Sequence, residues 1–534
     1  MDLVLRGGIV YGNGEATAVA VADGRIAAIG SDEQVGALAG RGTEVVDLGG
    51  GLLLPGLQDA HAHPVFAGLN LLRCELTELH DRAGYLAAVA AYAARTDGPW
   101  IMGAGWSYDV FGGHQPCRQD LDAIVADRPV FLAVRDAHSA WCNSRALELA
   151  GIDRHTPDPE GGRIERDADG EPTGVLHESA MELVSSVAPR PDAAEIRRAL
   201  LLAQSRLHSL GVTAWQDAIV GDYGGWPDCF EAYLAADREG LLTARVRGAL
   251  WWEPSRGLEQ LDDLRERREL ARGGGARFRT ETVKIMQDGV AENFTAAMLD
   301  PYLDGCGCAT DRRGISRVDP DHLREIVTLL DRDGFQVHFH AIGDRAAREI
   351  LDAVEPVAGS RLRHHVAHVQ VVHPDDVPRF GRLGVTVTMQ ALWAAHEPAM
   401  DELTIPFLGQ PRATWQYPFG DVWRTGGRLA AGSDWPVSDP DPFQAIHVAV
   451  NRVPYRVDAP PLGPEQGIDL ETAVRAYTAG SAYVNHLDET GVIAVGRLAD
   501  LALLDRDPFA GPVTEIGATR ALRTWVAGRL VHAG

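Results

Sequence analysis

Two histidines, His61 and His63, end the apolar stretch "GLLLPGLQDAHAHP" (51–64). Residues at i and i+2 of a β-strand share one face, so both imidazoles would project together from the end of one strand. Two neighbouring imidazoles can bind one divalent transition ion. A His-x-His pair in a strand is more often incidental than ligating, so the metal hypothesis depends on what other strand ends carry.

Polar side chains follow several later apolar runs in the same way. They are Lys284 in "VKIMQDG", His340 in "HFHAIGD", His368 in "VAHVQ" and Asp434 in "AGSDWP". Imidazoles, a carboxylate and a lysine that bridges if carbamylated suit zinc or a similar borderline ion. Calcium and magnesium would require more oxygen ligands.

Eight predicted strands must position these residues. A segment with helical periodicity follows each strand, so that strand and helix repeat as a unit. This alternation predicts an α/β fold, a TIM-like (β/α)₈ barrel, in which the carboxyl ends of all strands meet at one rim. The predicted strands are 52–63, 211–218, 244–252, 281–289, 335–344, 363–370, 384–390 and 428–436.

The remaining segments predict two additions to the barrel. Short β-rich runs with "GNG" and "DG" turn signals fill the first fifty residues, and similar runs return near the end of the chain. We therefore expect a small composite β-sandwich of residues 1–54 and 485–534, and a barrel domain of 55–484. A stretch at about 70–205 has strands of its own and is expected to be an inserted lid over the barrel mouth.

Composition excludes several classes of protein. Seventy-five acidic and fifty basic residues give the 534-residue chain a formal charge of −25, which opposes binding to nucleic acid or anionic lipid. No run of 18 apolar residues predicts a membrane span, and "MDLVLRGGIVYGNG" lacks the features of a secretory signal. Six scattered cysteines favour reduced thiols. We expect a cytoplasmic protein.

Several motifs together resemble the amidohydrolase superfamily, specifically amidohydrolase family 3, the branch with N-substituted formamide deformylase and related metal-dependent hydrolases. The resemblance covers nearly the whole chain. It is carried by "PGLQDAHAHP", "DAHSAWCNSRALELAGI", "PTGVLHE", "KIMQDG", "HAIGDRA", "GSDWPV" and "GVIAVGRLADLALLDRDP".

The resemblance implies a site for one or two Zn²⁺ ions or other divalent transition metals. His61 and His63 would hold one ion, a carboxylated Lys284 would bridge to a second ion, and His340 and His368 would hold that second ion. The resemblance also implies a homodimer.

Asp434 would lie beside the water activated by the metal. It would take the proton of the attacking water and pass it to the departing nitrogen. The leading hypothesis is hydrolysis of a C–N bond in a small N-formyl, N-acyl or cyclic amide. The alternatives are a deaminase of an amino-substituted heterocycle and a non-catalytic barrel that binds a small molecule.

Five further residues are candidates near the same rim. His338 shares a face with His340 and is expected to orient a ligand by a hydrogen bond. Glu178 is a rival metal-facing carboxylate, and His138 either binds substrate or belongs to a capped turn. Trp106 and Trp435 are candidate walls of the substrate pocket, although tryptophan is also ordinary core filling.

Overall fold

The computed structural model describes residues 1–77, 79–111, 116–135, 139–159, 162–223 and 226–534. These residues form two compact units. The first comprises Met1–His63, Gln204–Val220 and Leu234–Gly534, and the second comprises Pro64–Ala203 and Gly221–Tyr233.

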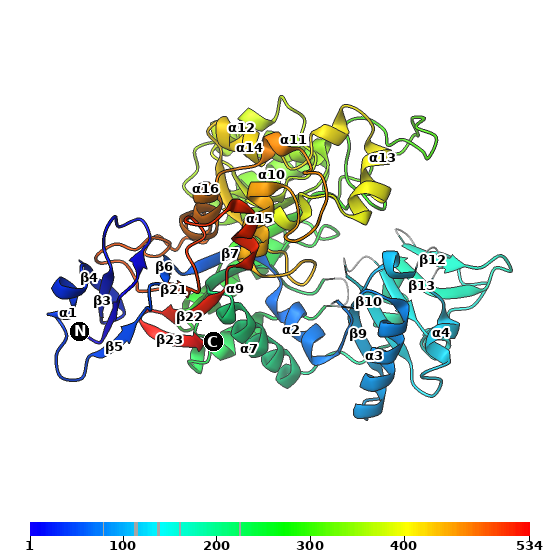
Figure 1. Cartoon of the computed structure of the whole chain (residues 1–534). Helices are drawn as coiled ribbons and strands as arrows, with labels where there is room; N and C mark the ends of the chain where they lie inside the picture. Colours follow the sequence, from blue (N-terminus) through cyan, green and yellow to red (C-terminus); the bar gives the residue numbers. More distant parts are fainter. Residues whose placement is uncertain (78, 112–115, 136–138, 160–161, 224–225) are drawn as a thin grey trace. The chain divides into compact units, whose positions relative to one another are not determined.

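The first unit contains an eight-stranded parallel sheet that curls into a nearly closed barrel (Figure 1). Each of its eight strands overlaps one of the eight expected barrel strands, so the predicted number and order of barrel strands are confirmed. They are almost entirely buried, as is typical of parallel strands covered on both faces. In sheet order they are β20 (Arg428–Ala431), β19 (Thr386–Met389), β18 (His365–His368), β17 (Gln336–Ala341), β16 (Phe278–Met286), β15 (Arg245–Trp251), β14 (Val212–Val220) and β7 (Leu57–Ala62).

Helices alternate with these strands and bury one apolar face each. Helix α10 (Pro320–Arg332) begins at Asp319, whose carboxylate accepts hydrogen bonds from the first turn, and Pro320 supplies a suitable first residue. Its buried side chains, spaced at three to four residues, are Leu323, Ile326, Val327 and Leu330.

The barrel closes between its first and last strands just beyond their ends. The backbone N–H of Asp434 donates to the carbonyl of His61, and the N–H of His63 donates to the carbonyl of Trp435, both at 2.7 Å. Gly432 permits this approach, because a Cβ atom there would lie 2.7 Å from the His61 backbone nitrogen. The closure brings the two ends of the barrel sequence together.

The expected first strand, 52–63, is in fact two strands in different sheets. The strand β6 (Leu52–Pro55) pairs with β21 (Leu501–Leu504), whereas β7 belongs to the barrel. The change occurs at Gly56, whose N–H donates to the carbonyl of Asp500 at 2.8 Å. A single 52–63 strand is therefore a wrong prediction.

The N-terminal segment forms one small sheet of its own and shares a second with the C-terminal strands (Figure 1). One consists of β4 (Arg25–Gly30), β3 (Ala18–Ala22), β1 (Leu3–Arg6) and β5 (Glu44–Asp47). The other consists of β2 (Ile9–Val10), β6, β21, β22 (Ala521–Val526) and β23 (Arg529–Ala533). One buried cluster unites N-terminal side chains such as Leu3 and Val19 with Leu501 and Trp525.

The second unit has a six-stranded sheet of its own. Its order is β12 (Gly162–Arg166), β13 (Pro172–Glu178), β11 (Ser139–Cys142), β10 (Val130–Val134), β9 (Ile101–Trp106) and β8 (Cys74–Glu75). These strands lie within the stretch at about 70–205, which was expected to have strands of its own.

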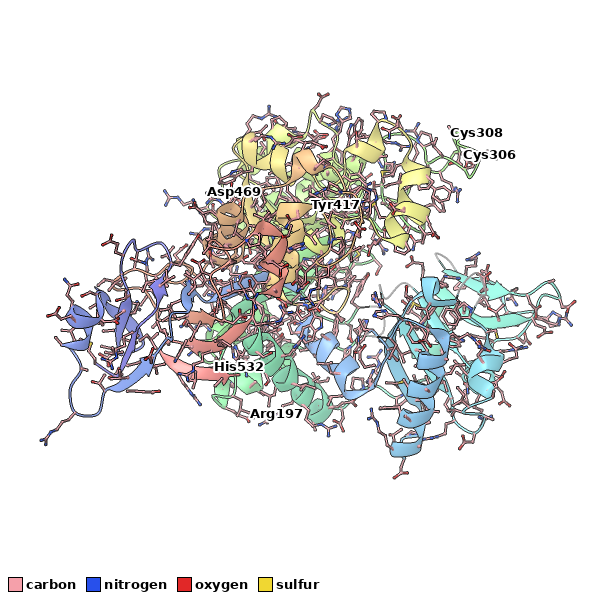
Figure 2. The ribbon with its side chains drawn as sticks, viewed as in Figure 1. Arg197, Cys306, Cys308, Tyr417, Asp469 and His532 are labelled. Atoms are coloured by element: carbon pink, nitrogen blue, oxygen red, sulfur yellow. The ribbon has the colours of Figure 1, made fainter. Side chains whose placement is uncertain are left out.

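All six cysteines are free thiols. Cys306 and Cys308 are exposed in one turn (Figure 2), and Cys74, Cys142 and Cys229 are buried. Among the described helices, none combines the length and the apolar character that a membrane crossing requires.

Candidate metal centre

Strand register aligns several polar side chains inside the barrel. Lys284 on β16 lies opposite His338 on β17, and His338 lies opposite His365 on β18. Nearer the carboxyl ends, Met286 is opposite His340 and Ala341 is opposite His368. The strands thus carry one polar layer within the barrel and a second at its rim.

Asp434 is at the middle of the rim cluster. Its Oδ1 atom lies 3.1 Å from Nε2 of His61 and 3.1 Å from Nε2 of His63. Its other oxygen lies 4.0 Å from Nδ1 of His368. Only the His63 side chain is appreciably exposed, at 12%. Three imidazoles from two distant parts of the sequence therefore surround one carboxylate.

The backbone is strained at two of these positions. Asp434 has φ 58° and His368 has φ 74°, a left-handed conformation that costs a residue with a side chain about 1 kcal/mol. Hydrogen bonds hold His368 there: its N–H donates to the side-chain oxygen of Gln390 at 2.6 Å. Asp434 is held by the closure bond to His61.

His338 contacts the cluster from deeper in the barrel. Its Nε2 atom lies 2.7 Å from Nδ1 of His61, so one proton is shared between the two rings. The ring of His365 packs against His338 with centroids 4.0 Å apart, and it also bonds to Thr388 and Gln216. This arrangement fixes the orientation of the His61 ring, so that Nε2 faces Asp434.

His340 lies on the other side of His368, with ring centroids 4.4 Å apart. Its Nε2 atom is 3.1 Å from the carbonyl oxygen of Gly289 and 3.5 Å from Oδ1 of Asp288. A neutral His340 that donates from Nε2 presents the lone pair of Nδ1.

Burial sets the protonation of the imidazoles. It lowers the pKa of His61 to about 3, with help from the charge of Lys284, and the pKa values of His338, His340 and His368 also fall well below 6.5. These rings are therefore neutral at pH 7, which is the form that binds metals.

Lys284 and Asp434 respond differently to burial in the same cluster. Burial lowers the pKa of Lys284 to about 7, and Asp434 opposes this only in part. Burial also disfavours the ionised form of Asp434, but His61, His63 and His368 outweigh it and hold the pKa of this carboxyl well below 3.8. Asp434 is thus ionised, whereas a large fraction of Lys284 is neutral near pH 7.

This donor set fits a divalent transition ion. Ligand atoms of His61, His368 and Asp434 lie within 4.8 Å of one another, so small side-chain movements would bring them to the separation of about 3.3 Å expected for two N or O atoms bound to one tetrahedral zinc ion. The Nδ1 atom of His368 is buried without a hydrogen-bond partner among the described residues. An unsatisfied buried nitrogen beside an ionised carboxylate is costly unless a cation joins them.

Sequence reasoning missed Asp59, which supports the cluster from β7. Its carboxylate accepts hydrogen bonds from the N–H of His61 at 2.9 Å and from the hydroxyl of Ser433 at 2.6 Å. It thereby ties the first barrel strand to the segment that carries Asp434. The available signal was an acidic residue inside the apolar run, two positions before His61.

Asp288 was also missed, and it supports the other half of the rim. Its buried carboxylate accepts from the N–H groups of Ile342 and Gly343 at 3.0 and 2.8 Å, and from Ala297 at 2.9 Å. Asp288 therefore joins the segment after β16 to the segment after β17, beside His340. The signal here was the "QDG" that follows "VKIM".

Trp393 completes the surroundings of His368. The two rings are parallel, with an interplanar angle of 1° and centroids 5.0 Å apart. Such stacking restricts rotation of the His368 ring. The sequence places Trp393 near the rim but does not indicate which ring it contacts.

The other candidates have separate positions. His138 lies outside the described residues. Glu178 ends β13 in the second unit, with φ 51°. Trp106 is fully buried in the core of that unit and donates from Nε1 to the carbonyl of Leu132 at 2.7 Å, so it is core filling there. Trp435 is 8% exposed and follows Asp434 directly.

Comparisons with known proteins agree with this geometry. The model of the amidohydrolase family matches residues 44–532. Putative amidohydrolase YtcJ of Bacillus subtilis is 29% identical, over 100% of this chain and 99% of its own. N-substituted formamide deformylase of Arthrobacter pascens is 28% identical, over 97% and 95%. Protein LONG AFTER FAR-RED 3 of Arabidopsis thaliana is 31% identical, over 99% and 91%.

Solved structures show the same fold along nearly the whole chain. An uncharacterized metal-dependent hydrolase from Pyrococcus horikoshii has a TM-score of 0.75 at 26% identity, covering 96% of this chain and 99% of its own. A second, from Pyrococcus furiosus, has a TM-score of 0.73 at 27% identity, covering 95% and 99%. The resemblance expected from the motifs is confirmed, and the chain belongs to the amidohydrolase family of hydrolases.

Proposed function

We propose that this protein is a metal-dependent amidohydrolase that cleaves a C–N bond of a small amide. The observation that carries the proposal is the buried cluster in which His61, His63 and His368 surround the ionised Asp434. The names of the relatives support it, since two are an amidohydrolase and a formamide deformylase and two solved structures are metal-dependent hydrolases.

Zinc is the ion that these donors favour, because they combine neutral imidazoles with carboxylate oxygen. His61, His63 and Asp434 would hold a first ion, and His340 and His368 would hold a second. A neutral amine is the form that reacts with carbon dioxide, so the lowered pKa of Lys284 favours its carboxylation. If Lys284 is unmodified, we expect one tightly held ion.

Zinc would supply a hydroxide nucleophile at neutral pH, because it lowers the pKa of bound water from about 15.7 to about 7. The ionised Asp434 would accept the proton of the attacking water at a carboxylate oxygen. It would then deliver that proton to the departing nitrogen, since an amine leaves poorly unless it is protonated. His338 would keep the ring of His61 in place throughout, through the 2.7 Å bond between them.

The domain organisation is part of the same proposal. Residues 1–54 and 485–534 would form a composite β-sandwich, which the shared cluster of Leu3 and Trp525 supports. Residues 55–484 would form the catalytic domain, with the insertion at about 70–205 as a lid. A homodimer in the cytoplasm is the proposed assembly and location.

The test is a hydrolysis screen of the metal-replete enzyme against N-formyl amines, N-acyl amines, cyclic ureas and lactams, with products identified by mass spectrometry. The proposal expects a carboxylate and an amine from at least one class. Ammonia release from an amino-substituted heterocycle would identify a deaminase instead. Purified protein without any transition metal and without turnover would indicate a non-catalytic barrel.

A His63→Ala variant provides a second test of the proposal. His63 is the most exposed imidazole of the cluster, so its removal leaves the core packing intact. We expect metal content and hydrolysis to fall together, because ligand loss weakens metal binding. Hydrolysis that persists in metal-depleted His63→Ala protein would contradict the proposal.

A further inference from the structure

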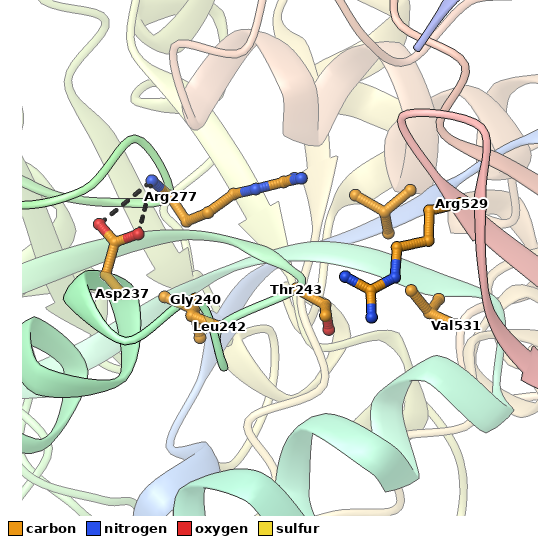
Figure 3. Close-up of a pocket in the computed structure, with 8 residues that line it drawn as sticks. Asp237, Gly240, Leu242, Thr243, Arg277, Arg529 and Val531 are labelled. Carbon is orange, nitrogen blue, oxygen red and sulfur yellow. Dashed lines mark hydrogen bonds between the residues drawn. The ribbon is translucent and has the colours of Figure 1, made fainter.

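A cavity of about 220 Å³ lies at the opposite end of the barrel from the metal centre (Figure 3). Its walls include Thr243, just before β15, and Arg277, just before β16. The hairpin of β22 and β23 supplies Val526, Arg529 and Val531. The cavity therefore lies where the C-terminal strands meet the amino ends of the barrel strands.

Two arginines line this cavity, and the carboxylates of Asp237 and Asp500 act on the charge of Arg277 only from beyond ion-pair distance. Figure 3 shows the Arg277 side chain extending from the Asp237 side toward Arg529. The Nη1 atom of Arg277 is buried and makes no hydrogen bond among the described residues. Within the same described ranges, no ion pair of 4.0 Å or less involves Arg277 or Arg529. A buried guanidinium nitrogen without an acceptor costs free energy that a bound anion would recover.

The neighbouring charges leave an excess of positive charge. Arg245 is bound to Asp500 through two contacts of 2.7 and 3.1 Å, so that pair is neutral. Asp237 is the one acidic residue in the cavity wall. Its carboxylate accepts hydrogen bonds from the backbone N–H groups of Arg277 and Phe278 at 3.0–3.2 Å, which satisfy its oxygens locally.

Thr243 adds a hydrogen-bond acceptor. Nδ1 of His208 donates to the carbonyl of Val212 at 2.9 Å, so Nε2 of this neutral ring accepts from the hydroxyl of Thr243 at 2.8 Å. The hydroxyl of Thr243 thus presents lone pairs and not a proton to the cavity, so an anion there would depend on the two guanidinium groups for its hydrogen-bond donors. The apolar wall is made by Leu242, Val526 and Val531.

We propose that this cavity binds a small oxyanion, a carboxylate or a phosphate group, between the guanidinium groups of Arg277 and Arg529. Guanidinium groups bind such anions through charge-assisted hydrogen bonds. The site is independent of the metal centre, because Arg277 precedes Lys284 on β16 by roughly 20 Å of extended strand. The anion would fasten the C-terminal hairpin to the barrel and stabilise the first unit.

The experiment titrates the metal-replete enzyme with inorganic phosphate and, separately, with succinate at low ionic strength. Calorimetry gives the affinity, and thermal unfolding gives the stabilisation. The variant is Arg529→Gln, which changes an exposed side chain. Arg238→Gln is the control, because Arg238 is exposed, follows Asp237 directly and does not line the cavity.

We expect at least one anion to bind, to raise the unfolding temperature, and to lose affinity about tenfold in Arg529→Gln but not in Arg238→Gln. The anion that binds more tightly identifies phosphate or carboxylate as the ligand class. An anion that binds only at the catalytic metal would bind all three proteins equally, and this result would overturn the proposal. Absence of binding by both anions at millimolar concentration would overturn it too.

Arg277→Gln gives a second, independent readout. We expect it to abolish stabilisation by the anion without lowering the unfolding temperature of the free protein, because the replaced guanidinium has an unsatisfied buried nitrogen. A lower unfolding temperature of the free variant would mean that Arg277 is already satisfied within the protein, against the proposal.

Discussion

The two ends of the barrel strands treat buried charge in opposite ways. At the carboxyl end, Lys284 is 1% exposed, its pKa falls to about 7, and the buried rings of His61 and His368 lie beside the carboxylate of Asp434. At the amino end, Arg245 and the 3% exposed Asp500 neutralise each other in a bidentate pair. A buried lysine with a lowered pKa thus lies where barrel enzymes keep their chemistry, whereas the buried pair of Arg245 and Asp500 lies where barrels gain stability.

Asp434→Asn should produce the largest effect at the carboxyl end. The amide cannot accept the proton of the attacking water, so we expect hydrolysis to slow by roughly 10²–10⁴-fold, the typical contribution of a general base. Metal should remain bound, since His61 and His63 remain and the amide oxygen of the new side chain can still donate a lone pair to the ion. Steady-state kinetics and elemental analysis of the same preparation measure both quantities. Near-normal hydrolysis with unchanged metal content would remove Asp434 from its assigned role.

Arg245→Met tests the amino end, where we expect a loss of stability and not of chemistry. The substitution leaves the buried Asp500 with the Ala527 N–H at 2.7 Å but without its bidentate partner. Breaking a buried pair in this way should lower the free energy of unfolding by about 3 kcal/mol, with kcat/KM nearly unchanged. Denaturant unfolding and kinetics provide the two measurements.

The exposed pair of Arg25 and Glu489, 2.9 Å apart, is the matched control for Arg245. Arg25→Met should lower the free energy of unfolding far less than Arg245→Met does, because solvent screens both charges of the exposed pair. Equal losses in the two variants would show that burial does not distinguish these pairs.

The effect of His208→Gln should be confined to acid pH and absent at neutral pH. Burial lowers the pKa of His208 to about 4. In the unfolded chain it is about 6.5, so the unfolded state binds more protons between pH 6.5 and pH 4. Stability therefore falls as the pH falls through that window, by up to roughly 1.4 kcal/mol per pH unit from this residue. Urea denaturation at several pH values should give a shallower slope for His208→Gln, and identical slopes would contradict this explanation.

Much of the barrel could be predicted from sequence because each strand is an apolar run with a polar end. That pattern, together with barrel topology, places His61 and Asp434 at one rim although they are far apart in the chain. The break at Gly56 could not be predicted, because β6 and β7 are both apolar and only their partners differ. Those partners, Asp500 and Gly211, are distant in sequence.

The contacts of the supporting residues Asp59 and Asp288 could not be predicted from the sequence either. Asp59 and Asp288 act on backbone N–H groups of Ser433 and of the segment after β17, and no local pattern encodes such contacts. Trp106, in contrast, was a candidate that the sequence did indicate. Its position beside a motif suggested a pocket wall, whereas the partners that bury it come from the sheet of the second unit.

The most direct measurement is a crystal structure of zinc-loaded protein with anomalous diffraction at the zinc edge. We expect an anomalous peak about 2.0–2.2 Å from ring nitrogens of His61 and His63, with a carboxylate oxygen of Asp434 beside it. A metal-replete, active enzyme whose anomalous peak lies elsewhere, with His61 and His63 uncoordinated, would contradict the assignment of this rim as the catalytic metal centre.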